Sequence, residues 1–328
     1  MSKWVISNLN ESDWDKSVFN LDGNYRQFYS WGNFKKETGW EVMRYIKVDN
    51  NNNTLALAQL LIKGLWPIYC IYIPGGIVDG KAGLPDDVLL LIKAVKKYTF
   101  KYVRIDSNYG VNLNNHININ FHRPSYKLNS SESLFFNLQD TDFINEATLK
   151  WKYNLRRAYK NNISIISDEK PDPEQIKKIY NEAILHRKNY REDDPTNFFL
   201  LNKHFKHKII FKKCLNNDKI IGFRCALVIN DIAWDYFGAI NQVGRKFKVG
   251  YPLLNELLNE CKKIGVKNYN LGGIELVKNP GVTKFKIDTG AKKISYVGEF
   301  EYSNVLLFKK LIDFIIKFLI EFKIKKLF

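Results

Sequence analysis

YNLGGIELVKNPGVTKFKIDTGAKKISYVGEF, residues 269–300 of a chain of 328 residues, is the part of the sequence that says most about the fold. Its first residues alternate like a β-strand, and glycines follow at positions 272, 273, 281 and 290 among several lysines. Glycine lets the backbone adopt positive φ or approach a ligand closely, and lysine suits an anionic ligand. The composition is typical either of a glycine-rich surface loop or of a site for a phosphate-rich ligand.

This stretch closes a pattern of elements that occurs twice. The first copy reads WEVMRYIKVD, TLALAQLLIK and PIYCIYIP as strands, PDDVLLLIKAVKKY as a helix and KYVRID as a strand. The second copy reads HKIIFKKCL, KIIGFRCALVI and IAWDYFGAI as strands, YPLLNELLNECKKIG as a helix and VKNYNLGG as a strand. The helix–strand junctions align without gaps, with VKKYTFKYVRID (residues 95–106) over CKKIGVKNYNLG (residues 261–272). The sequence therefore predicts a duplicated β-β-β-α-β unit.

Composition and charge limit the class of protein. The chain is 45% hydrophobic, which is enough to bury real cores, and its net charge of +17 indicates a polyanionic partner or an anionic membrane surface. The cysteines lie in apolar runs without a C-x-x-C pair, and we expect free, reduced core thiols; they are Cys70, Cys214, Cys225 and Cys261. The histidines show no zinc spacing, so no metal site is expected. Neither a signal-peptide core nor an uninterrupted apolar run of membrane-spanning length is present, which predicts a cytoplasmic protein.

An ordered set of motifs carries a family resemblance. The motifs are SWGNFKKETGW (30–40), YIPGGIVDG (72–80), RID (104–106), KWKYNLRRAYKNNISI (150–165), NLGGI (270–274), GVTKFKIDTG (281–290) and YVGEF (296–300). In this order they resemble the Fem family of tRNA-dependent aminoacyltransferases, which build the interpeptide bridges of bacterial peptidoglycan. The chain has no long heptad run for the helical arm of the larger members, so it resembles the compact type.

The resemblance implies an α+β or α/β fold of two tandem acetyltransferase-like (GNAT) units, with mixed sheets flanked by helices. We expect the first unit to span residues 1–140, completed by a C-terminal helix at 303–328, and the second to span residues 141–302.

The resemblance also implies a catalytic site at the pair Phe285 and Lys286. Lys286 would stabilise the oxyanion or the terminal phosphates of the tRNA, and Phe285 would shape the site or stack on a base. Asp106, at the end of a strand, would accept a proton or orient the attacking amine. Because no Ser-His-Asp or Cys-His arrangement is visible, we expect direct attack of the amine on the aminoacyl ester.

The expected contacts to the acceptor's diphosphate are Lys35, Arg187, Arg191 and Tyr251. Arg187 and Arg191 lie four residues apart in HRKNYRED, so a helix would present both guanidinium groups on one face.

Backbone groups are further candidates for substrate binding. Gly250 precedes a helix that is expected to begin near Tyr251, where free N–H groups would bind an anion together with the basic residues of GRKFKV. Gly272 and Gly273 are expected to let the backbone pass close to a ligand.

The expected co-substrate is aminoacyl-tRNA, without a further cofactor, and the expected acceptor is a lipid-linked peptidoglycan precursor. Two departures from the family pattern, Asn270 in place of an aspartate and the turn IDTG, support an alternative enzyme. That enzyme would acylate an amino sugar of a capsule or lipopolysaccharide with acyl-CoA or an aminoacyl donor. The net charge also fits a third class, a non-catalytic nucleic-acid- or membrane-binding protein.

Two basic segments have alternative interpretations. Residues 149–165 read as a helix followed by a strand, with Arg156 and Lys160 on one helix face that is either solvated or directed at phosphate. In the C-terminal helix, polar residues recur every four positions from Lys309 to Lys325 and form one narrow stripe. We expect its first half to pack on the first unit and its last turns, residues 323–328, to contact an anionic membrane at the inner face of the plasma membrane.

Overall fold

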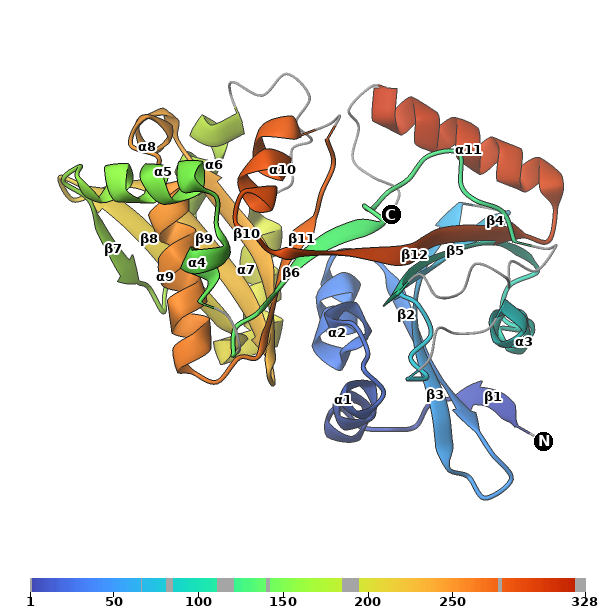
Figure 1. The fold of residues 1–328 in the computed structure, drawn as a ribbon. Helices are drawn as coiled ribbons and strands as arrows, with labels where there is room; N and C mark the ends of the chain where they lie inside the picture. The colour runs from blue at the N-terminus through green and yellow to red at the C-terminus, as the bar shows by residue number, and fades with distance from the viewer. Residues whose placement is uncertain are drawn as a thin grey trace. The chain divides into compact units, whose positions relative to one another are not determined.

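The computed structural model describes residues 2–65, 67–80, 85–110, 121–139, 142–184, 195–276 and 279–321. The chain divides into two compact units (Figure 1). Unit 1 comprises Met1–Ser131 and Ser295–Phe328, and unit 2 comprises Glu132–Ile294. The sequence-based expectation places these boundaries at residues 140/141 and 302/303.

Unit 1 is built on a mixed sheet with the strand order β1-β2-β3-β4-β5-β12. Its strands are β1 (Lys3–Ile6), β2 (Glu41–Val48), β3 (Thr54–Leu65), β4 (Ile68–Gly75), β5 (Phe100–Gly110) and β12 (Lys292–Ser303). Neighbouring strands are antiparallel except for β4 and β5, which are parallel. A parallel pair needs a crossover connection, and helix α3 (Pro85–Ala94) provides it.

Helices cover both faces of this sheet because the side chains of β4 alternate between two cores. Ile71 and Ile73 pack in the same cluster as Leu91 of α3. Cys70, on the opposite face, packs with Tyr102 and with Ile312 of α11 (Leu306–Glu321). The packing expected for the first half of the C-terminal helix is therefore present. The remaining helices of the unit are α1 (Glu11–Asn20), the 3₁₀ turn η1 (Tyr25–Gln27) and α2 (Tyr29–Glu37).

Unit 2 has a mixed sheet with the strand order β6-β11-β10-β9-β8-β7. Its strands are β6 (Glu132–Asn137), β7 (Ser164–Ser167), β8 (Ile209–Asn216), β9 (Lys219–Ile229), β10 (Ile232–Ile240) and β11 (Asn268–Gly273). Only β10 and β11 are parallel, and the short helix α8 (Gln242–Lys246) and the long helix α9 (Gly250–Lys263) connect them.

The helices of unit 2 also lie on both faces of their sheet. Ala226 of β9 faces a core formed with α9, α4 (Phe143–Glu146) and α5 (Leu149–Tyr159). The adjacent residue, Cys225, faces a core formed with α6 (Pro173–Ile184) and α7 (Thr196–Phe205). Adjacent strand residues point to opposite faces, so α5 and α6 cover opposite sides of the sheet (Figure 1).

The structure confirms the repeated order of elements. Strands β2, β3 and β4, helix α3 and strand β5 follow each other in unit 1, and β8, β9, β10, helix α9 and β11 do so in unit 2. In both units the helix joins the parallel pair. The gapless alignment places Val103 opposite Tyr269, and both side chains are fully buried. It also places Asp106 at the position of Gly272. Gly272 lies next to the end of β11, whereas Asp106 lies inside β5, paired with Glu299 on one side and Pro74 on the other, so the expectation that Asp106 ends its strand is wrong.

Of the two interpretations of residues 269–300, a glycine-rich surface loop does not hold around Lys286. Pro280–Ile287 form a helix, α10, with the proline in its first turn. Proline is tolerated there because the first N–H groups of a helix have no intrahelical partner. Lys286 therefore projects from the last turn of a helix.

The four cysteines are buried and free of disulfides, as their apolar surroundings predict. In the described part of the chain, no helix has both the length and the hydropathy needed to cross a membrane.

Candidate functional site

In unit 2, Lys286 lies over the end of strand β11. Its Nζ donates a hydrogen bond to the carbonyl oxygen of Gly273 at 3.0 Å. Gly272 has a φ of +77°, a backbone conformation that favours glycine, and its Cα side faces this Nζ, since a Cβ built there would lie 3.5 Å from it. Burial lowers the pKa of Lys286, the neighbouring Arg224 lowers it further, and Asp235 opposes the shift. The sequence candidates Lys286, Gly272 and Gly273 thus meet at one strand end.

Aromatic side chains support the helix that carries this lysine. The ring centroid of Phe285 lies 5.0 Å from that of Tyr251 and 6.4 Å from that of Trp151. The Tyr251 hydroxyl accepts a hydrogen bond from Nδ2 of Asn154 at 2.9 Å. The buried indole N–H of Trp151 has no hydrogen-bond partner among the residues that the structure describes. The sequence analysis assigns Phe285 to the tRNA donor and Tyr251 to the acceptor's diphosphate, yet the two rings are direct neighbours.

A partly buried ion pair lies close to Phe285 and Lys286. Arg224 of β9 donates to Asp235 of β10 through Nε at 2.7 Å and Nη2 at 2.6 Å, the two-pronged geometry that an arginine favours with a carboxylate. The guanidinium carbon lies 5.4 Å from the ring centroid of Phe285. The hydroxyl of Tyr269 also donates to Asp235, at 3.3 Å. The pair fixes the polar floor of the site, and we refer to Lys286, Phe285, Tyr251, Arg224 and Asp235 as the lysine site.

Asn270 stands where the family pattern has aspartate, and the structure shows its role. Its Oδ1 accepts a hydrogen bond from the backbone N–H of Gly272 at 2.7 Å and another from the Ser133 hydroxyl at 2.6 Å. Both contacts need only an acceptor oxygen, which the amide of asparagine provides as the carboxylate of aspartate would. The departure from the family pattern therefore leaves the geometry of the strand end intact.

In unit 1, Asp106 pairs with an arginine from a distant part of the chain. Nη1 of Arg26 donates to Oδ2 of Asp106 at 2.9 Å. Asp106 is only 2% exposed. Burial raises the pKa of this carboxyl to about 6; Arg26 lowers it and Glu299 raises it. Its charge state thus changes close to neutral pH, as a group that exchanges protons requires.

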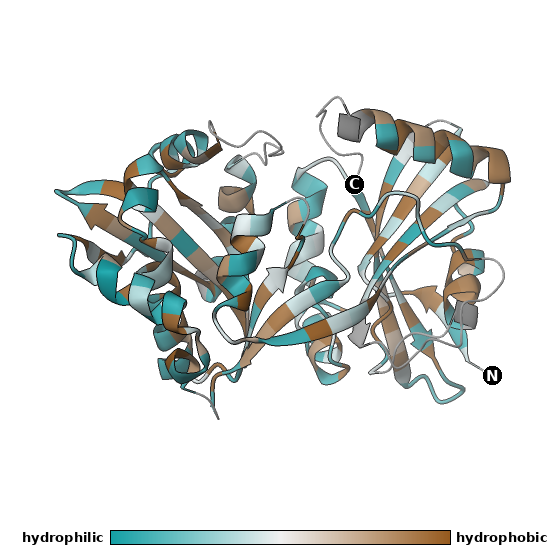
Figure 2. Ribbon diagram, turned by 45° about the horizontal axis from the view of Figure 1, so that its top comes forward, coloured by the Kyte–Doolittle hydropathy of each residue, from teal (hydrophilic) through white to brown (hydrophobic). Residues whose placement is uncertain are grey.

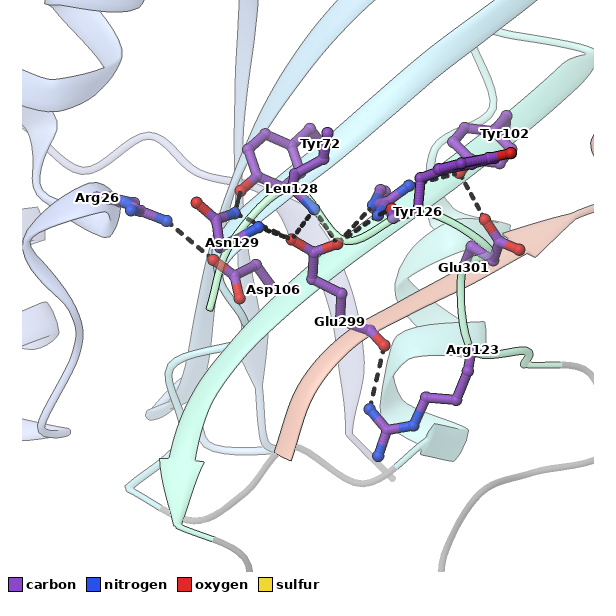
Figure 3. A network of polar contacts seen from close by, with 11 residues as sticks. Arg26, Tyr72, Tyr102, Asp106, Arg123, Tyr126, Leu128, Asn129, Glu299 and Glu301 are labelled. Atoms are coloured by element: carbon purple, nitrogen blue, oxygen red, sulfur yellow. Dashed lines mark hydrogen bonds and ion pairs between the residues drawn. The ribbon is translucent and has the colours of Figure 1, made fainter. Parts of the chain in front are cut away.

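A polar network next to Asp106 holds the strands of unit 1 in register (Figure 3). Glu299 of β12 lies opposite Asp106 of β5 in the antiparallel ladder. Its carboxylate accepts hydrogen bonds from Nε of Arg104 at 3.0 Å and from the backbone N–H groups of Leu128 and Asn129 at 3.0 and 2.6 Å. The Glu299 carboxylate thus has several partners, whereas the carboxylate of Asp106 is drawn with one, Arg26.

Lys35 connects to Asp106 through aromatic contacts. Its Nζ lies 5.1 Å from the ring centroid of Trp31, whose ring makes an edge contact with Tyr25 at 5.3 Å. The Tyr25 hydroxyl accepts a hydrogen bond from Nε of Arg26 at 3.3 Å. The cation of Lys35 and the carboxylate of Asp106 therefore belong to one continuous set of contacts. We refer to Lys35, Trp31, Tyr25, Arg26 and Asp106 as the carboxylate site.

The N–H groups that are expected to be free at the start of α9 are hydrogen-bonded within the chain. The N–H of Tyr251 is bonded to the carbonyl of Lys248 and that of Val249 to the carbonyl of Gly244, and Pro252 has none. Gly250 itself is buried at the first position of the helix. Arg245, expected to bind the same anion, donates to the backbone carbonyl of Ala183. Helix α8 leads directly into α9, so carbonyl groups of the preceding turn accept the hydrogen bonds of these N–H groups.

Two further candidates, Arg187 and Arg191, lie outside the described residues. The described part of the chain contains no group of three or more His, Cys, Asp or Glu side chains placed to hold a metal ion.

The sequence analysis did not identify several residues that the structure places in these sites. They are Arg26, Tyr25, Arg224, Asp235 and Trp151. A charged residue in the middle of an apolar strand is a usable signal, and IAWDYFGAI contains one, Asp235. No comparable signal marks Arg26, which lies in the turn η1, 80 residues before its partner.

Comparison with known proteins supports the family resemblance. The model of the FemAB family matches residues 220–317, which extend from β9 into α11 and contain the whole lysine site. No curated protein sequence matches the chain.

Solved structures show the same fold. The crystal structure of FemX matches with a TM-score of 0.77 at 15% identity, covering 94% of this chain and all of that one. L-PGS from Bacillus licheniformis matches with a TM-score of 0.59 at 11% identity, covering 93% and 96% of the two chains. A tandem GNAT protein from the clavulanic acid biosynthesis pathway matches with a TM-score of 0.57 at 9% identity, covering 92% and 98%. The expectation of tandem GNAT-like units is confirmed at the level of the fold.

Proposed function

We propose that this chain, a member of the FemAB family through residues 220–317, moves an amino acid from aminoacyl-tRNA to an amine of a peptidoglycan precursor. The observation that carries the proposal is the placement of Lys286 within the matched region. Lys286 is partly buried, its ammonium group lies next to Gly272 at a strand end, and the adjacent Phe285 packs against Tyr251. Such a cation is suited to stabilise negative charge that develops on an ester carbonyl.

The reaction requires little covalent chemistry from the protein. The acceptor amine attacks the ester carbonyl carbon, a C–N bond forms, and the C–O bond to the terminal ribose breaks. The amine loses a proton, and the ribose oxygen leaves as a hydroxyl. The enzyme must align the two groups, stabilise the oxyanion and handle that proton.

The proposal assigns these functions to individual residues. Lys286 of unit 2 stabilises the oxyanion or the terminal phosphates of the tRNA, and Phe285 shapes the place of the terminal base. Asp106 of unit 1 accepts the proton from the amine, since a carboxyl group with a pKa of about 6 is mostly ionised at neutral pH and still basic enough to take a proton. Lys35 is assigned to the acceptor's diphosphate.

The acceptor is proposed to be lipid-linked because α11 has an exposed apolar row. Leu307, Leu311, Phe314 and Phe318 are exposed one turn apart, on the side of the helix that faces away from the buried Ile312. Figure 2 shows hydrophobic segments along this helix between short hydrophilic ones. Exposed lysines on the same helix, Lys310 and Lys317, match an anionic bilayer surface. The tail proposed to add to this contact, residues 323–328, lies outside the described part.

The donor class is the decisive test. Purified protein is incubated with tRNA charged with radiolabelled amino acids, one at a time, and with a soluble or a lipid-linked peptidoglycan precursor. We expect incorporation of label into the precursor, and we expect ribonuclease treatment of the charged tRNA to abolish it.

The alternative enzyme gives a different result in the same assay. If acyl-CoA supports acylation of an amino sugar while charged tRNA transfers nothing to the precursor, the proposed function is wrong and the amino-sugar acyltransferase replaces it. A variant with Asp106→Asn and Lys286→Met serves as the background control, because spontaneous aminoacyl transfer does not depend on these side chains.

A further inference from the structure

Helix α5 has one buried face and one strongly basic face. Trp151, Asn154, Leu155 and Ala158 are buried against the core of unit 2. At about 100° per residue, the remaining positions form one continuous exposed arc. It carries Lys150, Tyr153, Arg156, Arg157 and, at the C-cap, Lys160.

The charges of this arc are not neutralised. Within the described residues, none of Lys150, Arg156, Arg157 and Lys160 forms an ion pair. Other cations of the same unit do so: Lys213 pairs with Asp168 at 2.6 Å, and Arg224 pairs with Asp235. Unpaired cations on a rigid helix retain their full attraction for an external anion.

The arc also carries an exposed aromatic ring. Tyr153 is 56% exposed in the middle of the cations, whereas Tyr159 at the edge of the helix uses its hydroxyl on Glu256. Cations interleaved with an exposed aromatic ring suit a nucleic acid, because phosphates and bases or sugars can be contacted together. A bilayer surface would instead need a row of large apolar side chains, and α5 exposes only Leu149.

Direct contacts tie α5 to the lysine site. The backbone N–H of Thr148, the N-cap of α5, donates to the carbonyl of Asp288 at the C-cap of α10, at 2.9 Å. Trp151, on the buried face of α5, contacts both Phe285 and Tyr251. The basic arc therefore begins beside Lys286 and extends away from it over about 16 Å, at a rise of about 1.5 Å per residue.

We infer that the exposed arc of α5 binds the phosphate backbone of the donor RNA, beyond the aminoacylated end that the lysine site holds. The inference rests on the proposed function for its choice of RNA. A helix of this length can contact several consecutive phosphates of one strand, and such contacts position the RNA without reading its sequence. Arg156 and Arg157 are assigned to phosphates, and Tyr153 to the sugar or an unpaired base between them.

Binding is tested first, without any transfer reaction. Uncharged tRNA labelled with a fluorophore is titrated with the wild type and with Arg156→Gln/Arg157→Gln over a range of salt concentrations. The matched control is Lys177→Gln/Lys178→Gln, which removes the same charge from exposed positions of α6 on the opposite side of the sheet. We expect the α5 variant to bind at least ~10-fold more weakly at low salt and to lose about one unit of salt slope per phosphate contact removed, and we expect the α6 control to match the wild type.

The second measurement separates a role in RNA binding from a structural role. Transfer is measured with two donors, charged full-length tRNA and the same amino acid esterified to a cytidine-cytidine-adenosine trinucleotide. We expect the α5 variant to raise KM for full-length tRNA and to leave transfer from the trinucleotide unchanged. Equal losses with both donors, tRNA binding equal to that of the wild type, or equal losses in the α6 control would each overturn the inference. If tRNA binding falls as expected while no donor supports transfer, the inference about α5 stands and the proposed function fails.

Discussion

At the scale of single residues, burial and nearby charge set the chemistry of the two candidate sites. Asp106 is shielded from water, and Arg26 is the cation that the described residues place in direct contact with its carboxylate. Shielding penalises the charged form, so the pKa rises although an arginine lies within hydrogen-bond distance. Lys286 shows the same physics with the opposite sign, since burial lowers the pKa of an ammonium group.

The first prediction concerns the pH dependence of transfer. If Asp106 accepts the proton, kcat/KM should fall about 10-fold per pH unit below pH about 6, because the protonated carboxyl cannot act as a base. Asp106→Asn should lower the rate at neutral pH and remove this acidic limb. The control is Asp87→Asn, which breaks an ion pair with Lys47 elsewhere in unit 1 and should leave the limb in place. An unchanged limb in Asp106→Asn would exclude Asp106 as the base.

The same raised pKa has a consequence for folding. The folded state binds a proton at Asp106 more tightly than the unfolded chain, whose carboxyl has a pKa near 3.9. The contribution of this group to the free energy of unfolding is therefore complete below pH about 4 and is lost as the pH rises through about 6.

The second prediction concerns Lys286→Met, which keeps the bulk of the side chain and removes its charge. Turnover should fall by ~100-fold or more, as for the loss of one preorganised oxyanion partner. Lys284→Met is the matched control, because Lys284 lies on the same helix and forms only an exposed pair with Asp288. Circular dichroism and thermal unfolding should show the wild-type fold for both variants. Turnover of Lys286→Met close to that of the control would remove Lys286 from the site.

At the scale of elements, helix α10 determines where Lys286 lies, and a glycine determines where α10 ends. Gly290 has a φ of +81°, and a Cβ there would lie 2.3 Å from the backbone oxygen of Glu146 in α4. The chain can therefore leave α10 and pass against α4 only with glycine at this position. Gly281, in the first turn of α10, has no atom within 4 Å of its hypothetical Cβ.

The third prediction compares these two glycines. Gly290→Ala should lower the free energy of unfolding by more than ~1 kcal/mol, because both the backbone conformation and the contact with Glu146 are incompatible with a side chain. Gly281→Ala should raise stability by up to ~1 kcal/mol, since alanine is the better helix former and the space is open. Urea denaturation of both variants measures the difference. Equal effects would show that the tight contact at Gly290 does not constrain the end of α10.

At the scale of the whole molecule, the net charge of +17 includes exposed cations on two surfaces that differ in their apolar and aromatic side chains. The arc of α5 combines cations with one tyrosine, whereas α11 combines cations with a row of large apolar side chains. An ion pair of 2.9 Å between Lys309 and Glu301 fixes α11 to β12, and Ile312 and Ile316 are buried beneath it. The apolar row is therefore held on a rigid element and remains exposed.

The fourth prediction tests whether this row contacts a membrane. Leu307 and Phe314 are 69% and 65% exposed, so Leu307→Ser/Phe314→Ser should not disturb the core. Binding to vesicles that contain phosphatidylglycerol should weaken by ~10-fold or more, because each side chain would lose roughly 1.5–3 kcal/mol of apolar burial. Ile6→Ser/Leu149→Ser removes comparable exposed apolar surface elsewhere and is the control. Vesicle binding that is equal in the two variants would exclude α11 as the contact surface.

The order of the elements, their duplication and the family resemblance can all be read from the amino-acid sequence. Apolar periodicity and helix-end residues act locally, so the β-β-β-α-β pattern and the helix–strand alignment can be read without a structure. The motif order also singled out Phe285, Lys286, Gly272 and Gly273, which the fold brings together at the end of β11. Their catalytic and binding roles remain predictions.

The groups that surround these residues could be identified from the tertiary structure but not from the sequence. Arg26 and Asp106 are 80 positions apart, and the pairing of Arg224 with Asp235 depends on the register of β9 and β10. The N–H groups expected to be free before α9 are hydrogen-bonded because α8 precedes it. Lys286 lies on helix α10 and not on a glycine-rich loop. Register, burial and long-range pairing arise from the packing of the whole chain, whereas sequence patterns report mainly local preference. For this reason the sequence could name the lysine of the candidate site but not the ion pair close to it.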